Sequence, residues 1–295
     1  MPSTVGTLPA LSRASSSRQL RAVRSFLLDP KASVSVALLG VFVVIALFAP
    51  LIAPHGENEQ NRQKSYLSPS RDHPLGTDRL GRDVLSRMIY GSRISLRIGI
   101  VAMGVAVAVG VPLGLLAGYA GRWPDEIIMR FVDAMIAFPN LIFLLFVIAI
   151  IGPGVTNVMI AIGLNSFPVY ARLTRAQTLS LKQRDYVLAA RALGATDSMI
   201  LRRHVLPNAV QPIIVQGSLF LGAAVLAESG LSFLGIGIQP PTATWGIIIA
   251  DGFPVIRVNP WMAISPGVAI VAFVLSVNLL GDRLRDVLDP RLRGR

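Results

Sequence analysis

Cysteine is absent from this sequence of 295 residues, and only 15% of the residues are charged. Without cysteine the chain can form neither disulfides nor thiolate-bound metal sites. Soluble domains usually carry about 25% charged residues, so the shortage of charge argues against a soluble protein. The 53% of hydrophobic residues and the mean hydropathy of +0.60 indicate a membrane protein instead.

Motifs for catalysis are also missing. The sequence has no Gly-x4-Gly-Lys-Ser/Thr loop, so it cannot cradle the phosphates of ATP in that way. It has no Gly-x-Ser-x-Gly nucleophile motif, and its three histidines, His55, His73 and His204, show no metal-ligand spacing. We therefore predict a chain that is not an enzyme, binds no metal and holds no cofactor of its own.

Long stretches without Asp, Glu, Lys or Arg predict an all-α integral membrane protein. A helix that crosses the hydrocarbon core needs about 20 apolar residues. The stretch 134–171 is too long for one helix and is interrupted by Ile151-Gly152-Pro153-Gly154, which predicts two helices joined by a tight turn. About six spans follow, at residues 34–54, 94–120, 134–151, 155–172, 209–230 and 260–281.

Three other segments carry local signals. Residues 229–250 are charge-free but rich in glycine and proline, which predicts a loop or re-entrant segment, because irregular backbone at membrane depth must be buried in protein or line a cavity. Residues 71–93 repeat apolar residues at helical spacing and predict an amphipathic helix on the outer face. Small residues in the second span favour close helix packing, and Pro112 and Pro139 favour kinks.

Most basic residues fall on one predicted side of the membrane. With six spans both termini share a side, and the segments there carry 19 of the 28 Lys and Arg residues. Cytoplasmic loops attract Lys and Arg, so we predict that both termini are cytoplasmic. Topology and anionic lipid headgroups then explain the net charge of +12, and no basic face interleaved with aromatics suggests nucleic acid. The predicted parts are a tail (1–33), a first span with an extracytoplasmic segment (34–93), a five-span core (94–281) with a cytoplasmic loop (172–208), and a second tail (282–295).

The loop 172–208 has the most informative pattern of the chain. Asp185–Leu193 is rich in Ala and Leu and favours a helix, and Gly194 is a natural C-terminal stop. Thr196 or Asp197 can cap a second helix of about nine residues, which Pro207 is expected to limit. Two helices this short must dock on the bundle or on a soluble partner.

This loop resembles the signature cytoplasmic loop of bacterial ATP-binding-cassette importer permeases. The pattern is Glu-Ala-Ala, three residues, Gly, nine residues, then Ile-x-Leu-Pro, and here Leu188 replaces the Glu and His204 replaces the Ile. The resemblance implies that the loop inserts into a cleft on a separate ATPase subunit and relays its closure. The residues implied in this coupling are Tyr186, Ala189, Ala190, Arg191, Gly194, Ala195, His204, Leu206 and Pro207.

Further segments resemble the dipeptide, oligopeptide and nickel importer subfamily, and most closely its second, C-type permease subunit. They are His73–Arg87, Tyr90–Leu96, Gly152–Gly154, and Leu231–Pro241 with Trp245-Gly246. The resemblance implies import of di- or oligopeptides across the bacterial cytoplasmic membrane, with nickel chelates or glutathione as alternative cargo. It also implies a homologous permease partner, two ATPase subunits that bind ATP and Mg, and an extracytoplasmic substrate-binding protein.

Polar residues within or near the spans leave two interpretations open. Asn165, Gln211, Gln216, Glu228 and Asn278 can form interhelical hydrogen bonds or line a pathway or gate. For Glu228 the alternatives are structural pairing or capping near the outer end of the fifth span, a gate or binding-protein contact, and a contact with substrate.

The segment after Glu228 adds two expectations. Pro240, Pro241 and Trp245 are expected to contact a binding protein. Trp245 and Trp261 also fit an interfacial aromatic belt.

Two other classes of protein remain as alternatives. A stand-alone secondary transporter or channel predicts midplane ionisable residues and an inverted repeat, whereas the ionisable residues here lie near span ends. A membrane enzyme requires a catalytic cluster, and none is visible.

Overall fold

The computed structural model describes residues 29–288. Most of the predicted N-terminal tail and the last seven residues of the chain lie outside this range, while residues 30–33 and 282–288 belong to the adjoining helices. The described chain is helical, with no β-strand beyond an isolated bridge between Thr77 and Asp83. The all-α membrane fold is thus confirmed. The main helices are α2 (Pro30–Leu47), α3 (Ala49–Ile52), α4 (Val84–Ala120), α5 (Arg122–Ala137), α6 (Asn140–Ile151), α7 (Val155–Leu181), α8 (Asp185–Ala192), α9 (Asp197–Ile200), α10 (Leu206–Phe233), α11 (Trp245–Gly252) and α12 (Trp261–Leu288).

The centre of the bundle is the long contact between α4 and α7. At Gly110, an added Cβ would lie 2.5 Å from the carbonyl oxygen of Phe167, and at Gly118 it would lie 2.7 Å from Cβ of Thr178. Only glycine permits backbones to approach this closely, and dispersion then holds the helices together. The packing interpretation of the small residues is confirmed for this face of α4. The helix also continues through Pro112.

Three helical stretches among the described residues are long and apolar enough to cross a membrane. They are Val84–Ala120, Asp197–Phe233 and Trp261–Val287, and the bent pair α5 and α6 adds a fourth if it counts as one span. The other two predicted spans correspond to α2, which is short, and α7, which carries several polar residues. By length and composition the helices therefore support three or four spans where the sequence predicted about six.

The prediction of a single helix over residues 134–151 is wrong. The chain bends by 97° between α5 and α6. Phe138, at the break, is extended with φ −73° and ψ 130°, because the residue before a proline, here Pro139, is driven away from helical geometry. The segment 122–133, expected in a cytoplasmic loop, is part of α5.

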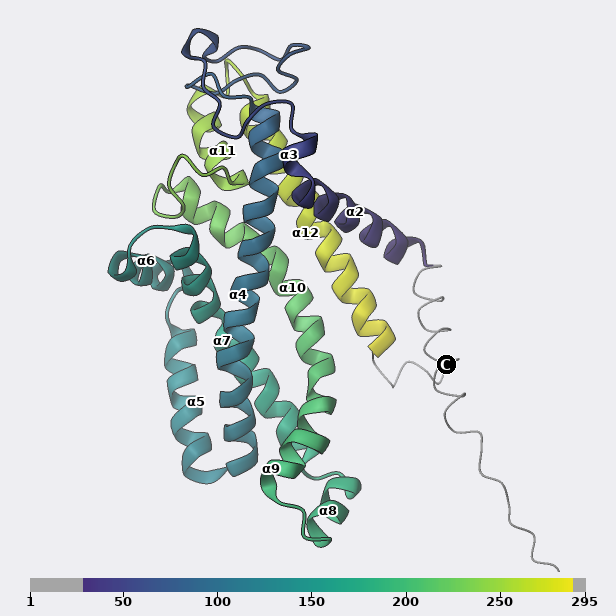
Figure 1. Cartoon of the computed structure of the whole chain (residues 1–295). Helices are drawn as coiled ribbons and strands as arrows, with labels where there is room; N and C mark the ends of the chain where they lie inside the picture. Colours follow the sequence, from purple (N-terminus) through teal and green to yellow (C-terminus); the bar gives the residue numbers. More distant parts are fainter. Residues whose placement is uncertain (1–28, 289–295) are drawn as a thin grey trace, which may run out of the picture.

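One end of the bundle is closed by a cap made of residues 53–83, α11 and the start of α12 (Figure 1). The predicted amphipathic helix over 71–93 is wrong for its first half, since the helix begins only at Val84. Gly76 and Gly81 have φ of 76° and 72° in the loop before it, a left-handed geometry that glycine adopts at no steric cost.

The glycine- and proline-rich segment 229–250 is irregular only in its middle. Helix α10 continues to Phe233, residues 234–244 form a loop, and α11 follows. The predictions for Trp245 are wrong, because its side chain is 1% exposed. Its ring packs against Phe42 and Phe273, and its Nε1 donates to the carbonyl oxygen of Met88, 3.2 Å away. It therefore reaches neither a membrane interface nor a docked protein.

Candidate functional site

An elbow of residues 182–207 joins α7 to α10 at the end of the bundle opposite the cap (Figure 1). It consists of α8, a bend at Gly194, α9 and a π-helical turn, Leu201–Val205. Gly194 has φ of +82°, and the amide of Ala195 beyond it donates to the carbonyl oxygen of Ala190 at 3.0 Å. The sequence predicted that Gly194 ends this helix, and the glycine does so in the left-handed conformation.

The second arm of the elbow begins as expected but does not stop where expected. The side chain of Thr196 caps α9 by accepting from the amide of Met199 at 3.4 Å. Pro207 does not limit this helix, since the chain continues through the π turn into α10. Pro207 lies just after the π turn, at the second position of α10. The second arm of the elbow and α10 therefore form one continuous helical stretch, Asp197–Phe233.

The inner side of the elbow is anchored in its own bundle. Val187, Ile200 and Val205 are fully buried, and they pack against Leu115 and Tyr119 of α4. Burying three such side chains is worth several kcal/mol, at about 1.5–3 kcal/mol each. These apolar contacts thus hold the elbow against α4.

Polar contacts reinforce the same attachment. The hydroxyl of Tyr119 donates to Oδ1 of Asp197 at 2.5 Å and accepts from Nη2 of Arg191 at 3.1 Å. The Arg191 guanidinium also lies 5.8 Å from the centre of the Tyr119 ring, and the hydrogen bond to Tyr119 raises the pKa of Arg191 further, so it stays charged. Lys182 donates to the carbonyl oxygen of Gly118 at 2.8 Å, near the negative end of the α4 dipole.

Sequence reasoning missed Tyr119 and Asp197 as members of this site. The two residues are 78 positions apart, so no spacing rule relates them. The buried apolar residues Val187, Ile200 and Val205 lie 13 and 5 positions apart, so they show no helical spacing that could have marked the contact either.

The outer side of the elbow is exposed. Leu193 at its tip is 89% exposed, and Tyr186, Leu188 and Met199 are exposed as well. Of the residues implied in coupling, four are half-buried and five are exposed. The half-buried ones are Ala190, Ala195, His204 and Leu206; the exposed ones are Tyr186, Ala189, Arg191, Gly194 and Pro207. The rings of Tyr186 and His204 lie 6.1 Å apart, so the structure brings the two ends of the sequence motif together.

The polar residues of the spans are not gathered into one site. Asn165 lies on α7, Gln211 and Gln216 on α10 and Asn278 on α12. Gln211 and Asn278 are exposed, and Asn165 and Gln216 are half-buried. No hydrogen bond joins any two of them within residues 29–288, so neither open interpretation is decided by their contacts.

Glu228 differs, because it is fully buried on α10. Its Oε1 accepts from the hydroxyls of Ser232 and Thr244, both at 2.8 Å. Thr244 caps α11 by accepting from the amide of Ile247 at 3.2 Å. The carboxyl group therefore ties α10 to the start of α11, which supports the structural alternative for this residue.

The sequence motif His73–Arg87 forms much of the cap. Arg82 and Arg87 are 1% exposed, and Nε of Arg82 lies 2.6 Å from Oδ2 of Asp78. The exposed loop that holds Pro240 and Pro241 is joined to the cap through Ala243, whose amide donates to Oε1 of Glu57 at 3.0 Å. His55 and His73, which show no metal-ligand spacing in the sequence, stack in this cap with ring centres 4.8 Å apart.

Two family models match the chain. Residues 110–294 match the model described as binding-protein-dependent transport system inner membrane component. Residues 19–69 match the model for the N-terminal TM domain of oligopeptide transport permease C. The first match begins at residue 110, within α4, and includes the whole elbow.

Similar proteins are named for transport. The chain is 40% identical to the dipeptide transport system permease protein DppC of Alkalihalophilus pseudofirmus over 89% of this chain and 86% of that protein. It is 44% identical to the glutathione transport system permease protein GsiD of Pectobacterium atrosepticum, over 86% of this chain and 84% of that protein.

A solved structure shares the fold. An inward-facing conformation of the MetNI methionine ABC transporter superposes with a TM-score of 0.56 at 21% identity, covering 69% of this chain and 96% of that chain.

Proposed function

The chain belongs to the binding-protein-dependent transport system inner membrane component family and is a permease subunit of an ATP-driven importer, and from this premise we propose that its elbow is the docking site of a separate ATPase subunit. ATP and Mg are bound by that partner, and the permease itself catalyses no reaction. The observation that carries the proposal is the division of the elbow into an anchored inner side and an exposed outer side.

The exposed side has the composition of a protein contact. Leu193, Leu188 and Tyr186 present apolar surface to solvent, and exposed arginines such as Arg202 and Arg203 flank it. A lipid-facing surface would not carry these charges, whereas exposed apolar patches with polar rims are typical of interfaces. A cleft on an ATPase that receives the tip of the elbow is the matching partner.

The anchored side offers a route for motion. Because α9, the π turn and α10 form one helical stretch, a displacement of the elbow displaces the cytoplasmic half of α10. The contacts with Tyr119 pass the same displacement to α4. ATP binding by the partner supplies the differential stabilisation that two access states require.

The remaining partners follow from the same arrangement. An exposed stripe on α10 that includes Ile214, Leu226 and Phe233 faces a homologous permease subunit or the shared pathway. An extracytoplasmic substrate-binding protein docks on the cap, where Pro240 and Pro241 are exposed. Both termini then lie in the cytoplasm, on the side of the elbow.

Di- or oligopeptides are the proposed cargo. The relatives are named for a dipeptide and for glutathione, which is itself a short peptide. Glutathione and nickel chelates are the alternative cargoes, and uptake assays with each of them distinguish the three.

The test is reconstitution of the chain with its permease partner, ATPases and binding protein. We expect ATP-dependent peptide uptake, and we expect Leu193→Asp to reduce recovery of the ATPase with the permease at least tenfold, since a buried charge at an interface centre costs about 2 kcal/mol or more. Leu67→Asp is the control, since Leu67 is also exposed but lies in the cap. Undiminished ATPase recovery with Leu193→Asp would refute the docking site, and absence of uptake for every peptide would refute the cargo.

A further inference from the structure

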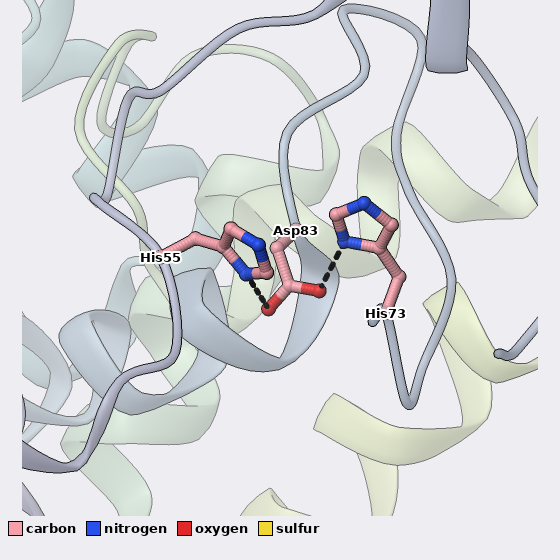
Figure 2. Close-up of side chains that lie close together, drawn as sticks. All are labelled: His55, His73 and Asp83. Carbon is pink, nitrogen blue, oxygen red and sulfur yellow. Dashed lines mark hydrogen bonds and ion pairs between the residues drawn. The ribbon is translucent and has the colours of Figure 1, made fainter. Parts of the chain in front are cut away.

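Three potential metal ligands meet in the cap, although they are far apart in the sequence. His55 follows α3, His73 lies in the loop that leads to α4, and Asp83 is the N-cap residue of α4. Figure 2 shows the carboxylate of Asp83 between the two imidazole rings, with one oxygen directed at each ring. The site lies at the end of the bundle opposite the elbow.

The separations suit a shared ion. Nδ1 of His73 lies 3.0 Å from Oδ1 of Asp83, and Nδ1 of His55 lies 3.9 Å from Oδ2. One donor atom from each of the three residues lies within 4.8 Å of the others. Zinc bonds of about 2.0–2.2 Å place tetrahedral ligands about 3.3 Å apart, so small side-chain rotations bring all three atoms onto one ion.

The backbone around the ligands is held before any ion arrives. The amide of Ser86 donates to Oδ2 of Asp83 at 2.7 Å, and the hydroxyl of Ser86 accepts from the amide of His55 at 3.0 Å. The amide of His73 donates to the hydroxyl of Ser70 at 3.1 Å. Such outer hydrogen bonds orient ligands and reduce the entropy that binding must overcome.

One ring nitrogen that faces Asp83 has no partner. Nδ1 of His55, which lies 3.9 Å from Oδ2 of Asp83, is buried and has no hydrogen-bond partner among the described residues. Buried polar atoms are nearly always paired, so each exception in a native structure requires an explanation. A bound cation is one such explanation, because the nitrogen of a neutral imidazole that carries no proton is a good ligand for a metal ion.

We propose that His55, His73 and Asp83 bind one divalent transition-metal ion of the Zn²⁺ type. Two imidazoles and one carboxylate form a donor set that favours such ions over Mg²⁺ or Ca²⁺, which prefer oxygen ligands alone. The ligands border a cavity of about 80 Å³, which has room for a water molecule as a further ligand. Glu59 and Lys64 also line this cavity, so a second carboxylate offsets the positive charge of the lysine.

The ion would fasten three segments together. It joins the end of α3 and the loop at His73 to the first turn of α4, and thus stabilises the surface of the cap. This inference does not rest on the proposed docking of an ATPase, since the site is at the opposite end of the bundle and its occupancy can be measured without transport.

The test uses the full chain purified through an affinity tag that contains no histidine. After treatment with a chelator, titration with Zn²⁺ should give one bound ion per chain and a higher midpoint of thermal unfolding. Titration with Co²⁺ should give visible d–d absorption bands that Zn²⁺ then removes. Absence of both a stoichiometric ion and the Co²⁺ bands in the folded wild-type chain would overturn the proposal.

Variants locate the site. His73→Gln and His55→Gln should each weaken Zn²⁺ binding at least tenfold, while His204→Gln, which changes the third histidine of the chain at the elbow, should leave it unchanged. If either cap variant fails to fold, the Co²⁺ spectrum of the wild type still decides the question. Binding that persists in both folded cap variants would also refute the assignment.

Discussion

Tyr119 at the end of α4 donates its hydroxyl hydrogen to the carboxylate of Asp197 at the start of α9, over 2.5 Å. The same hydroxyl accepts from Arg191 on α8. One side chain of the bundle thus holds both arms of the elbow, on either side of the bend at Gly194. Motion imposed on the elbow by an ATPase would reach α4 through this contact as well as through the helix that leads into α10.

Tyr119→Phe should uncouple hydrolysis from transport. The variant keeps the ring that packs on the elbow but removes both hydrogen bonds. Because Asp197 is exposed and Tyr119 is only half-buried, solvent weakens the interaction, and we expect a coupling energy of about 1 kcal/mol between Tyr119→Phe and Asp197→Asn in a double-mutant cycle. ATP-driven uptake should fall several-fold, while hydrolysis by the assembled complex falls less.

Tyr90→Phe is the control, since Tyr90 lies on the same helix at the end near the cap. Equal loss of uptake in the two variants would contradict a specific role of the contact between Tyr119 and Asp197.

Gly110→Ala should destabilise the bundle. The new Cβ would lie 2.5 Å from the carbonyl oxygen of Phe167, so α4 and α7 must separate and lose contacts along their length. Overpacking of this kind typically costs about 1–3 kcal/mol, which is measurable as a lower midpoint of thermal unfolding in detergent. Gly104→Ala lies on the same helix with nothing within 4 Å of its Cβ, and it should be neutral or stabilising, because alanine favours helices by about 1 kcal/mol over glycine.

Gly194→Ala should strain the bend of the elbow. With φ of +82° at this position, a Cβ costs about 1–2 kcal/mol, although nothing else lies within 4 Å of it. We expect weaker ATPase recovery with little change in the stability of the bundle. Gly194→Asn should recover part of the loss, since asparagine tolerates this geometry. If the alanine and asparagine variants behave alike, the left-handed backbone conformation is not the reason why the elbow requires glycine at position 194.

Local signals made the elbow predictable, and their absence explains what was missed. Gly194 and Thr196 act on their own neighbours, so the bend and the cap could be inferred from a few adjacent residues. Pro139 was recognised as a source of kinks, but a bend of 97° depends on what α5 and α6 pack against. Pro207 was misjudged because the π turn before it cannot be read from composition.

Contacts between distant segments could not be predicted in the same way. The meeting of His55 with His73 and Asp83 depends on how the cap loops close over α4. The burial of Trp245 depends on Phe42 of α2 and Phe273 of α12. A spacing rule covers one element at a time. Sites assembled from several elements therefore require the fold.

Glu228 allows the structural and gating alternatives to be separated. Its Oε1 accepts two hydrogen bonds, from Ser232 and Thr244, and a glutamine at this position keeps an oxygen that accepts both. Glu228→Gln should therefore preserve the unfolding midpoint and ATP-driven uptake. Glu228→Ala leaves two buried hydroxyls without their acceptor and creates a cavity, at a cost of about 2–4 kcal/mol.

The outcome with Glu228→Gln decides between the two roles. If a negative charge at this position gates the pathway, Glu228→Gln should abolish uptake while the protein remains as stable as the wild type. Thermal unfolding and peptide uptake measured on the same preparation separate these cases, because a tie between α10 and α11 needs an acceptor oxygen and a gate of this kind needs the charge.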